Sequence, residues 1–121
     1  MEKVGGIIFF RTRMLQTLKD FYLNRMGMDI WLDQGGCIIF RMSNFLFGFC
    51  EQQEKLTTGG MITFFYPTRD DVDRAYDDLL DIATSKPEEN IPYKIYQFFA
   101  VDPEGRELEF QTFLHPIDWK F

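Results

Sequence analysis

The stretch Gly5-Gly6-Ile7-Ile8-Phe9-Phe10 is matched later in the chain by Gly59-Gly60-Met61-Ile62-Thr63-Phe64. A second match aligns Ile38-Ile39-Phe40 with Phe99-Ala100-Val101. Self-similarity of this kind indicates two copies of one supersecondary unit, each too small to bury its apolar face alone. Because clefts between such units are where small ligands bind, the repeat also predicts a ligand site between the copies.

The size and composition of the chain limit what it can be. A length of 121 residues predicts one domain, covering residues 1–121. The net charge of −6 argues against nucleic acid and anionic membranes as partners. No apolar run approaches the roughly 20 residues needed to cross a bilayer. Two cysteines without a leader sequence favour a reducing cytoplasm, in which thiols stay free.

The first copy, module 1, covers about residues 4–52 and predicts the element order β-α-β-β-β. The apolar stretch from Gly5 to Arg11 predicts a strand, and the helical spacing that follows it stops at Gly27. Three further strands follow, the last two joined by Ser43-Asn44. Two residues form a tight hairpin loop, in which Asn tolerates a positive φ. The resulting register predicts that Cys37 and Cys50 are direct cross-strand neighbours. The expected cytoplasmic setting favours free thiols, and the alternative is a strained disulfide.

The second copy, module 2, covers about residues 59–114 and repeats the plan. Polar residues from Gln52 to Thr58 predict the linker between the modules. A strand precedes a helix whose first turn is capped by Thr68. The closing hairpin turns on Asp102-Pro103-Glu104-Gly105. With a loop of Glu104-Gly105, Ala100 is expected opposite Glu109, and Phe98 opposite Gln111.

The final strand decides which residues face a ligand. Residues 107–113 alternate polar and apolar, and period two places alternate side chains on opposite faces. Leu108 and Phe110 are therefore expected to pack on the helices. Glu109 and Gln111 are expected to share the other face.

Two segments resemble motifs of a known family. Asp102-Pro103-Glu104-Gly105-Arg106-Glu107-Leu108-Glu109-Phe110 resembles the closing hairpin of the vicinal oxygen chelate superfamily, which contains the glyoxalase I, bleomycin-resistance and extradiol dioxygenase proteins. Phe21-Tyr22-Leu23-Asn24-Arg25-Met26-Gly27 resembles the motif of its first helix. The resemblance covers nearly the whole chain. It implies an α+β fold of two tandem βαβββ modules that form a curved mixed sheet with a central cleft and helices on the outer face, and it implies a homodimer.

The resemblance also implies where a metal would bind. The divalent-metal ligands of the family's metalloenzymes correspond to Ile7 (or Ile8), Gly48, Met61 and Glu109 of this sequence. Only Glu109 can hold a hard or borderline metal, whereas a catalytic zinc site wants about three protein ligands. The single histidine, His115, lies beyond the last strand. We therefore expect no metal site and no other cofactor.

Strand alternation extends the candidate site beyond the carboxylate of Glu109. Two interpretations of Glu109 stay open. In the first, it acts on a ligand as a hydrogen-bond acceptor or general base. In the second, it has no remaining function and is solvated or paired with Arg11 or Arg41. The two arginines could bind an anionic ligand or simply neutralise glutamates. The predicted ligand-binding residues are Ile7, Phe9, Arg11, Arg41, Gly48, Met61, Thr63, Phe65, Phe98, Ala100 and Gln111.

Three functions remain compatible with these residues. The first is a bleomycin-resistance-like protein that binds a small, partly apolar ligand without a metal. The second is a lyase or isomerase, or a dioxygenase-like enzyme, that uses Glu109 as a base or within an unrecognised metal site. The third is a non-catalytic scaffold that binds a protein partner.

Overall fold

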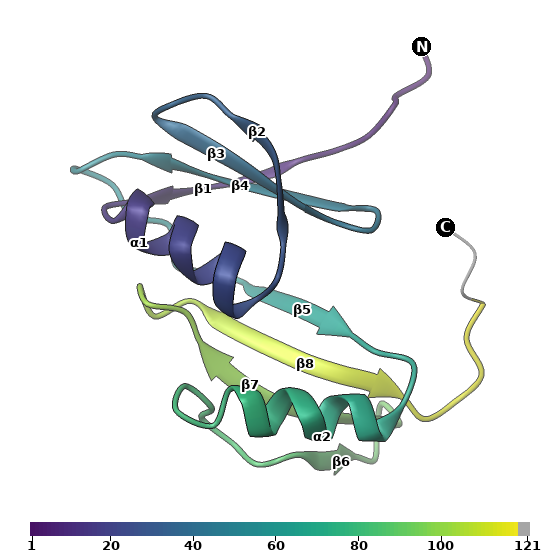
Figure 1. The fold of residues 1–121 in the computed structure, drawn as a ribbon. Helices are drawn as coiled ribbons and strands as arrows, with labels where there is room; N and C mark the ends of the chain where they lie inside the picture. Colours follow the sequence, from purple (N-terminus) through teal and green to yellow (C-terminus); the bar gives the residue numbers. More distant parts are fainter. Residues whose placement is uncertain (119–121) are drawn as a thin grey trace. The chain divides into compact units, whose positions relative to one another are not determined.

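The structure, a computed structural model, describes residues 1–118. The chain divides between Thr58 and Gly59 into two compact units, which we call unit 1 and unit 2. The boundary falls at the end of the predicted linker. The two units together have the tandem α+β plan predicted from the repeat, and each builds its own four-stranded mixed sheet (Figure 1).

Unit 1 contains one helical segment and four strands. Its sheet has the order β1-β4-β3-β2, in which β1 runs parallel to β4 and the other neighbours are antiparallel. The helix continues into a π-helical segment, η1, and Gly27, at a φ of 65°, follows it as the predicted stop. The elements are β1 (Ile8–Thr12), α1 (Leu15–Asp20), η1 (Phe21–Arg25), β2 (Asp29–Asp33), β3 (Cys37–Met42) and β4 (Phe45–Glu51).

Unit 2 repeats this arrangement. Its sheet has the order β5-β8-β7-β6, again with the first strand parallel to the last. Thr68 caps the helix as predicted, because its Oγ1 accepts a hydrogen bond from Asp71 N at 3.2 Å. The elements are β5 (Met61–Phe65), α2 (Arg69–Asp78), β6 (Glu88–Asn90), β7 (Ile95–Val101) and β8 (Glu107–Phe113).

Each sheet packs one face against its own helix. In unit 1 the buried ring of Tyr22 contacts the rings of Phe40, Phe47 and Phe49, with centroids 5.7, 5.2 and 5.2 Å away. These aromatic contacts supply much of the apolar area that the small core buries.

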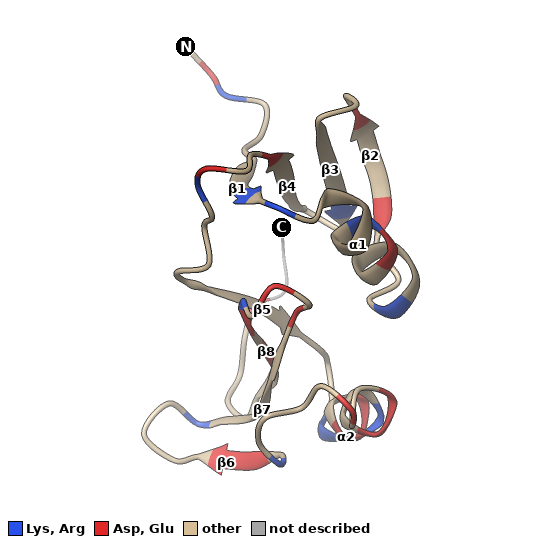
Figure 2. Cartoon of the chain, turned by 90° about the vertical axis from the view of Figure 1, so that its left-hand side faces the viewer, with Lys and Arg blue, Asp and Glu red and all other residues tan. Residues whose placement is uncertain are grey.

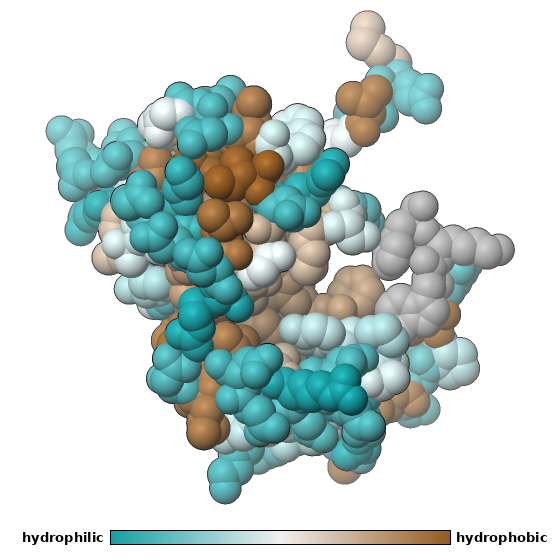
Figure 3. All heavy atoms as spheres, in the orientation of Figure 1, coloured by the Kyte–Doolittle hydropathy of each residue, from teal (hydrophilic) through white to brown (hydrophobic). Residues whose placement is uncertain are grey.

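In unit 2 the same role falls to Tyr76 of α2, which meets Phe98 edge-on at 5.3 Å. Phe98 in turn stacks on Phe110 at 4.9 Å. The outer surface of α2 is mostly hydrophilic, as expected for a helix with one buried side (Figure 3).

The first hairpin has the predicted register. Met42 pairs with Phe45, and Ile39 with Gly48, so the loop is Ser43-Asn44. The positive φ, 54°, falls on Ser43 rather than on Asn44. Cys37 pairs with Cys50, as expected.

The expectation of free thiols is wrong. Cys37 and Cys50 form a disulfide, with their Cα atoms 4.1 Å apart. Direct opposition on neighbouring strands brings the two sulfur atoms within bonding reach. The expectation of free thiols rested on a reducing location, whereas the predicted register had already placed the two cysteines opposite one another.

The second hairpin differs from the prediction by one residue. Val101 pairs with Glu107 and Asp102 N donates to Arg106 O, so the loop is the three residues Pro103-Glu104-Gly105. Gly105 has a φ of 85°. A three-residue loop that ends on a left-handed residue is a common hairpin closure. The predicted two-residue loop is therefore wrong.

A buried ionic cluster holds this loop in place. Arg106 Nη1 lies 3.3 Å from Asp102 Oδ2 and 2.8 Å from Glu104 Oε1, and Arg106 is 2% exposed. Asp102 Oδ1 also accepts hydrogen bonds from the backbone N–H groups of Glu104 and Arg106. Buried charges are tolerated when they are paired in this way.

No helix within residues 1–118 is both long and apolar enough to cross a membrane.

Candidate functional site

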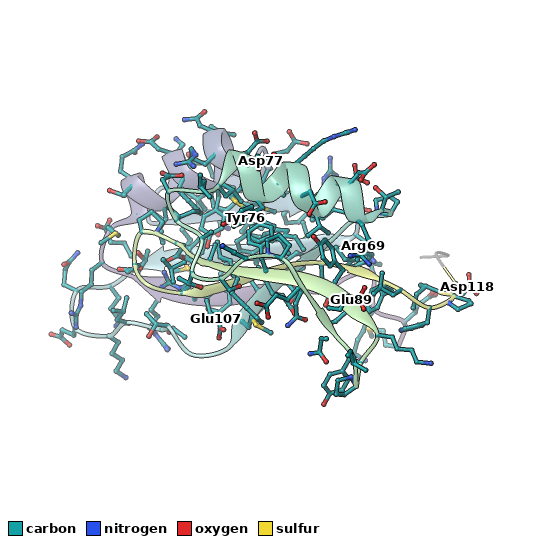
Figure 4. All side chains as sticks on the ribbon, turned by 90° about the horizontal axis from the view of Figure 1, so that it is seen from below. Arg69, Tyr76, Asp77, Glu89, Glu107 and Asp118 are labelled. Atoms are coloured by element: carbon teal, nitrogen blue, oxygen red, sulfur yellow. A yellow bond between two sulfur atoms is a disulfide. The ribbon has the colours of Figure 1, made fainter. Side chains whose placement is uncertain are left out.

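The open face of unit 2, meaning the sheet face away from α2, carries the predicted carboxylate. Ile62, Leu108 and Phe110 are buried on the α2 side. Alternation then turns the odd-numbered residues of β5, β7 and β8 to the open face. Figure 4 shows Glu107 on the side of the sheet opposite α2. The predicted parity of Glu109, Gln111, Met61, Thr63 and Phe65 agrees with this arrangement.

Glu109 is held by a hydrogen bond from the neighbouring strand. Thr63 and Glu109 are direct partners in the parallel pair of β5 and β8. The Thr63 hydroxyl donates to Glu109 Oε1 at 2.8 Å. Glu109 is only 6% exposed. Because a buried carboxylate is costly unless it is hydrogen-bonded, this contact fixes both its position and its orientation.

Two predicted site residues lie on the wrong face. Phe98 and Ala100 are fully buried and pair with Phe110 and Leu108, on the α2 side of the sheet. The three-residue loop of the second hairpin causes the error, since a slip of one residue turns every side chain over. The alignment of Ile38-Ile39-Phe40 with Phe99-Ala100-Val101 is displaced for the same reason.

Gln97 and Phe99 take their places on the open face of unit 2. Phe99 pairs with Glu109, and Gln97 with Gln111. The turn sequence contained a signal for this register, because Pro at the second position and Gly at the fourth suit a type I turn that continues into a left-handed residue.

The open face of unit 1 gathers the other predicted residues. Phe9 pairs with Gly48, Arg11 with Cys50, and Arg41 with Leu46, all with the parity that turns them away from α1. A Cβ on Gly48 would lie 2.8 Å from Phe9 Cε1, so the ring of Phe9 rests on the bare backbone of Gly48. Glycine at this position allows that close approach.

An apolar hollow of about 340 Å³ lies in unit 1. Its lining includes Ile7, a predicted site residue, Leu46, the expected partner of Arg41, and Trp31, which was not predicted. Trp31 belongs to β2, a strand from which no site residue was predicted. Alternation from Ile30, the partner of Phe40 on the α1 side, already turns Trp31 to the open face.

The donor set does not fit a metal. Ile7 and Gly48 have no side-chain donor, Met61 offers only a thioether sulfur, and Glu109 is the sole oxygen ligand among the four positions. Within residues 1–118 no group of three His, Cys, Asp or Glu side chains could hold an ion. His115 lies against the ring of Phe113, with centroids 5.6 Å apart.

A charged cluster covers the other side of unit 2. Arg69 lies over the ring of Tyr96 at 4.2 Å and pairs with Glu89 at 2.7 Å, and Figure 4 shows Arg69 and Glu89 close together. Tyr96 donates to Asp73 at 2.6 Å, and this hydrogen bond raises the pKa of Tyr96. These contacts tie α2 to β6 and β7, so we assign them a structural role.

Comparisons with solved structures extend the fold assignment. A glyoxalase/bleomycin resistance protein/dioxygenase from Nocardioides superposes with a TM-score of 0.77 at 15% identity, covering 100% of this chain and 90% of the other. A family enzyme from Burkholderia phytofirmans PsJN gives 0.77 at 16% identity, covering 88% and 95%. The lactoylglutathione lyase from Agrobacterium tumefaciens gives 0.73 at 16% identity, covering 93% and 94%. No protein-family model and no curated protein matches the sequence.

Proposed function

Because this chain has the fold of the vicinal oxygen chelate superfamily, we propose that it is a single domain that binds a small, partly apolar ligand without a metal. The observation that carries the proposal is the buried Glu109 carboxylate, positioned by Thr63 on a sheet face that its own helix leaves uncovered. The bleomycin-resistance proteins, which belong to the superfamily that this sequence resembles, sequester their ligands rather than transform them.

The surroundings of Glu109 suit a ligand with one polar group and an apolar body. Met61 and Phe65 are 47% and 41% exposed on the same face. Gln111, Gln97 and Phe99 lie on that face on the two neighbouring strands. Surfaces of this composition, apolar with a few placed polar groups, are typical of the lining of small-molecule sites. The hydrogen bond from Thr63 occupies Oε1, which leaves Oε2 to accept a donor from the ligand.

Unit 1 supplies a second apolar surface of the same kind. Phe9 is 47% exposed above Gly48, and Ile7 lines the hollow beside Trp31. Arg11 and Arg41 offer guanidinium groups that would suit an anionic substituent of the ligand.

A thermal-shift screen of small, partly apolar compounds tests this function. A true ligand raises the melting temperature of the wild-type protein, and Glu109→Gln reduces that shift. Glu51→Gln, which removes an exposed carboxylate at the end of β4, is the matched control and leaves the shift unchanged. A set of binders that all respond equally to both variants would contradict the assignment of Glu109 to the site.

A second function is a lyase or isomerase with Glu109 as general base. The specific observation in its favour is the fixed orientation of the carboxylate, since a base must lie within hydrogen-bond reach of the proton it removes. The two functions differ in one readout. An enzyme incorporates solvent deuterium into a bound ligand, and Glu109→Gln abolishes the exchange while binding persists; a binding protein shows no exchange in either form.

We also propose a homodimer located in the cytoplasm. The exposed apolar side chains of Phe9, Met61 and Phe65 support an association that covers them. Light scattering after size exclusion measures the mass in solution. A monomer at concentrations of about 100 µM would contradict the dimer.

A further inference from the structure

The disulfide between Cys37 and Cys50 lies on the open face of unit 1 and has no role in the function proposed above. The two cysteines share this face with Gly48 and Arg41, because alternation turns all four residues away from α1. Both cysteines are half-buried rather than enclosed, so the open face leaves the bond within reach of a small reagent. Disulfides that are exposed in this way are the labile or regulatory ones.

Arg11 lies beside Cys50 on the neighbouring strand. The two residues are direct partners in the parallel pair of β1 and β4, with their side chains on the same face. Figure 2 shows the basic end of β1, which runs beside β4. A cation next to a cysteine stabilises the thiolate form of that cysteine. If the disulfide opens, Arg11 therefore favours negative charge on the sulfur of Cys50.

The corresponding place beside Cys37 holds an uncharged residue. Gln34 N donates to Cys37 O at 2.8 Å, so Gln34 lies opposite Cys37 just beyond the end of β2. Gly35 and Gly36 follow without side chains, and a Cβ on either glycine would meet no atom of residues 1–118 within 4 Å. The side of Cys37 that points away from Cys50 is therefore uncharged on this face and has room for a small molecule.

The neighbouring carboxylates face the other side of the sheet. Glu51 follows Cys50 in β4, and Asp33 ends β2; both have the parity that faces α1. Asp33 lies 3.6 Å from Lys19 of α1, in agreement with this direction. Among residues 1–118, the charge that the strand register places next to the bond on the open face is the guanidinium of Arg11.

This asymmetry decides how a thiol would open the bond. In thiol–disulfide exchange a thiolate attacks one sulfur, and the sulfur that forms the more stable thiolate leaves faster. Attack on Cys37 expels Cys50 next to Arg11, whereas attack on Cys50 expels Cys37 next to Gln34. Access agrees with charge, because the thiolate approaches from the side opposite the bond that it breaks. For Cys37 that side is the glycine turn.

We propose that Cys37 and Cys50 form a redox-exchange site, at which a small thiol attacks Cys37 and Cys50 leaves as a thiolate stabilised by Arg11. The incoming sulfur bonds to Cys37 Sγ, the bond between the two cysteines breaks, and its electron pair stays on Cys50 Sγ. A second small thiolate then attacks the attached thiol's sulfur and releases Cys37. Two small thiols are thereby oxidised to their disulfide, and the two protons that they lose end on the cysteines.

The mixed disulfide on Cys37 places the small thiol on the open face of unit 1. That face therefore responds to the redox state of its surroundings. The exchange site is separate from Glu109 and Thr63, and its chemistry does not depend on whether those residues bind a ligand.

Brief exposure of the fully oxidised chain to excess 2-mercaptoethanol tests the order of attack. Acid quenching stops the exchange because it protonates the thiolates, and peptic digestion with mass spectrometry then locates the adduct. The expected result is at least five-fold more adduct on Cys37 than on Cys50. Equal amounts, or an excess on Cys50, would overturn the proposal. So would a disulfide that persists intact in the folded protein under excess reagent.

Substitutions of Arg11 separate its charge from a purely structural role. Arg11→Gln should reduce the preference for Cys37 to less than two-fold, whereas Arg11→Lys keeps the charge and should hold it above three-fold. Arg74→Gln is the matched control, since it removes an equal charge from α2, where the Arg74 side chain is 78% exposed. It should leave the wild-type preference unchanged. An undiminished preference in folded Arg11→Gln would overturn the proposal.

Discussion

Thr63 donates its hydroxyl hydrogen to Glu109 Oε1 across 2.8 Å, joining a short side chain of β5 to a buried carboxylate of β8. The two residues are 46 positions apart in the chain and meet only because β5 and β8 pair in parallel. In the other unit, the corresponding pair of the first and last strands is Phe9 and Gly48. The same position in the repeat therefore holds the hydrogen bond between Thr63 and Glu109 in unit 2, and the contact of the Phe9 ring with the backbone of Gly48 in unit 1.

Removing the Thr63 hydroxyl should destabilise the protein. Thr63→Val keeps the shape of the side chain but leaves Glu109 Oε1 without its donor, and a buried unsatisfied acceptor costs about 1–3 kcal/mol. Urea unfolding measures the loss. Thr63→Ser retains a hydroxyl and should recover at least half of it. Identical stabilities for the valine and serine variants would show that the hydrogen bond does not contribute.

Gly48→Ala should disturb the open face of unit 1. The added methyl group would lie 2.8 Å from Phe9 Cε1 and 3.1 Å from the carbonyl oxygen of Ile38. Overpacking of this kind costs about 1–3 kcal/mol. The same substitution in a Phe9→Ala background should cost less, because the ring is gone and only the Ile38 contact remains. A cost that is unchanged in that background would mean that Phe9 does not rest on Gly48.

The disulfide should contribute to the stability of unit 1. Cys37 and Cys50 are 13 residues apart, and closing a loop of about 15 residues is worth up to about 3 kcal/mol in the chain-entropy account. Reductant should lower the free energy of unfolding of the wild type. The Cys37→Ser/Cys50→Ser variant should not respond to it.

Mass spectrometry of alkylated protein determines whether the bond is present in cells. The cytoplasmic location predicted from composition favours two free, alkylated thiols, whereas the structure predicts none. Finding the intact disulfide in protein trapped directly from its native compartment would contradict a reducing location.

Purified protein should hold no stoichiometric divalent metal. Ile7, Gly48 and Met61 supply no oxygen or nitrogen side-chain ligand at three of the four positions where the family resemblance implies them. Elemental analysis after dialysis measures this directly. About one zinc, nickel, manganese or iron per chain would contradict the prediction and favour an enzyme with ligands that the four positions do not include.

Stability should fall at alkaline pH partly through Tyr66. Burial raises the pKa of Tyr66 above its ordinary value of 10.0, and the charges of Asp71 and Asp78 raise it further. Unfolded Tyr66 ionises near pH 10 while the folded form stays protonated, so this contribution is present below pH 10 and is lost as the pH rises through the folded pKa.

Urea unfolding between pH 8 and pH 11 measures this slope. Tyr66→Phe should make it shallower, because the replaced ring does not titrate. Tyr93→Phe is the control, since Tyr93 is 73% exposed and should keep the wild-type slope. Equal slopes for Tyr66→Phe and the wild type would show that the phenol does not contribute.

The sequence by itself determined the repeat, the type and order of most elements, and which faces β1, β3 and β4 of unit 1 turn to the helix. These features follow from local signals. Apolar residues alternate with polar residues in the strands, apolar residues recur at helical spacing before Gly27, and Ser43-Asn44 forms a two-residue turn. The faces of β5 and β8 also follow from alternation alone, which is why Glu109, Gln111, Met61, Thr63 and Phe65 were placed correctly. The short strand β6 lies in a stretch, residues 85–92, whose sequence indicates a loop, since three residues carry little periodicity.

Only the tertiary structure decided the features that depend on pairing between strands. The left-handed conformation of Gly105 set the loop length of the second hairpin, and so exchanged Phe98 and Ala100 for Gln97 and Phe99 on the open face. Parallel pairing joined Thr63 to Glu109, and the structure joined Cys37 and Cys50, already predicted as neighbours, by a disulfide. Periodicity specifies the face of a side chain, but its partner depends on a register that one residue in a turn can shift.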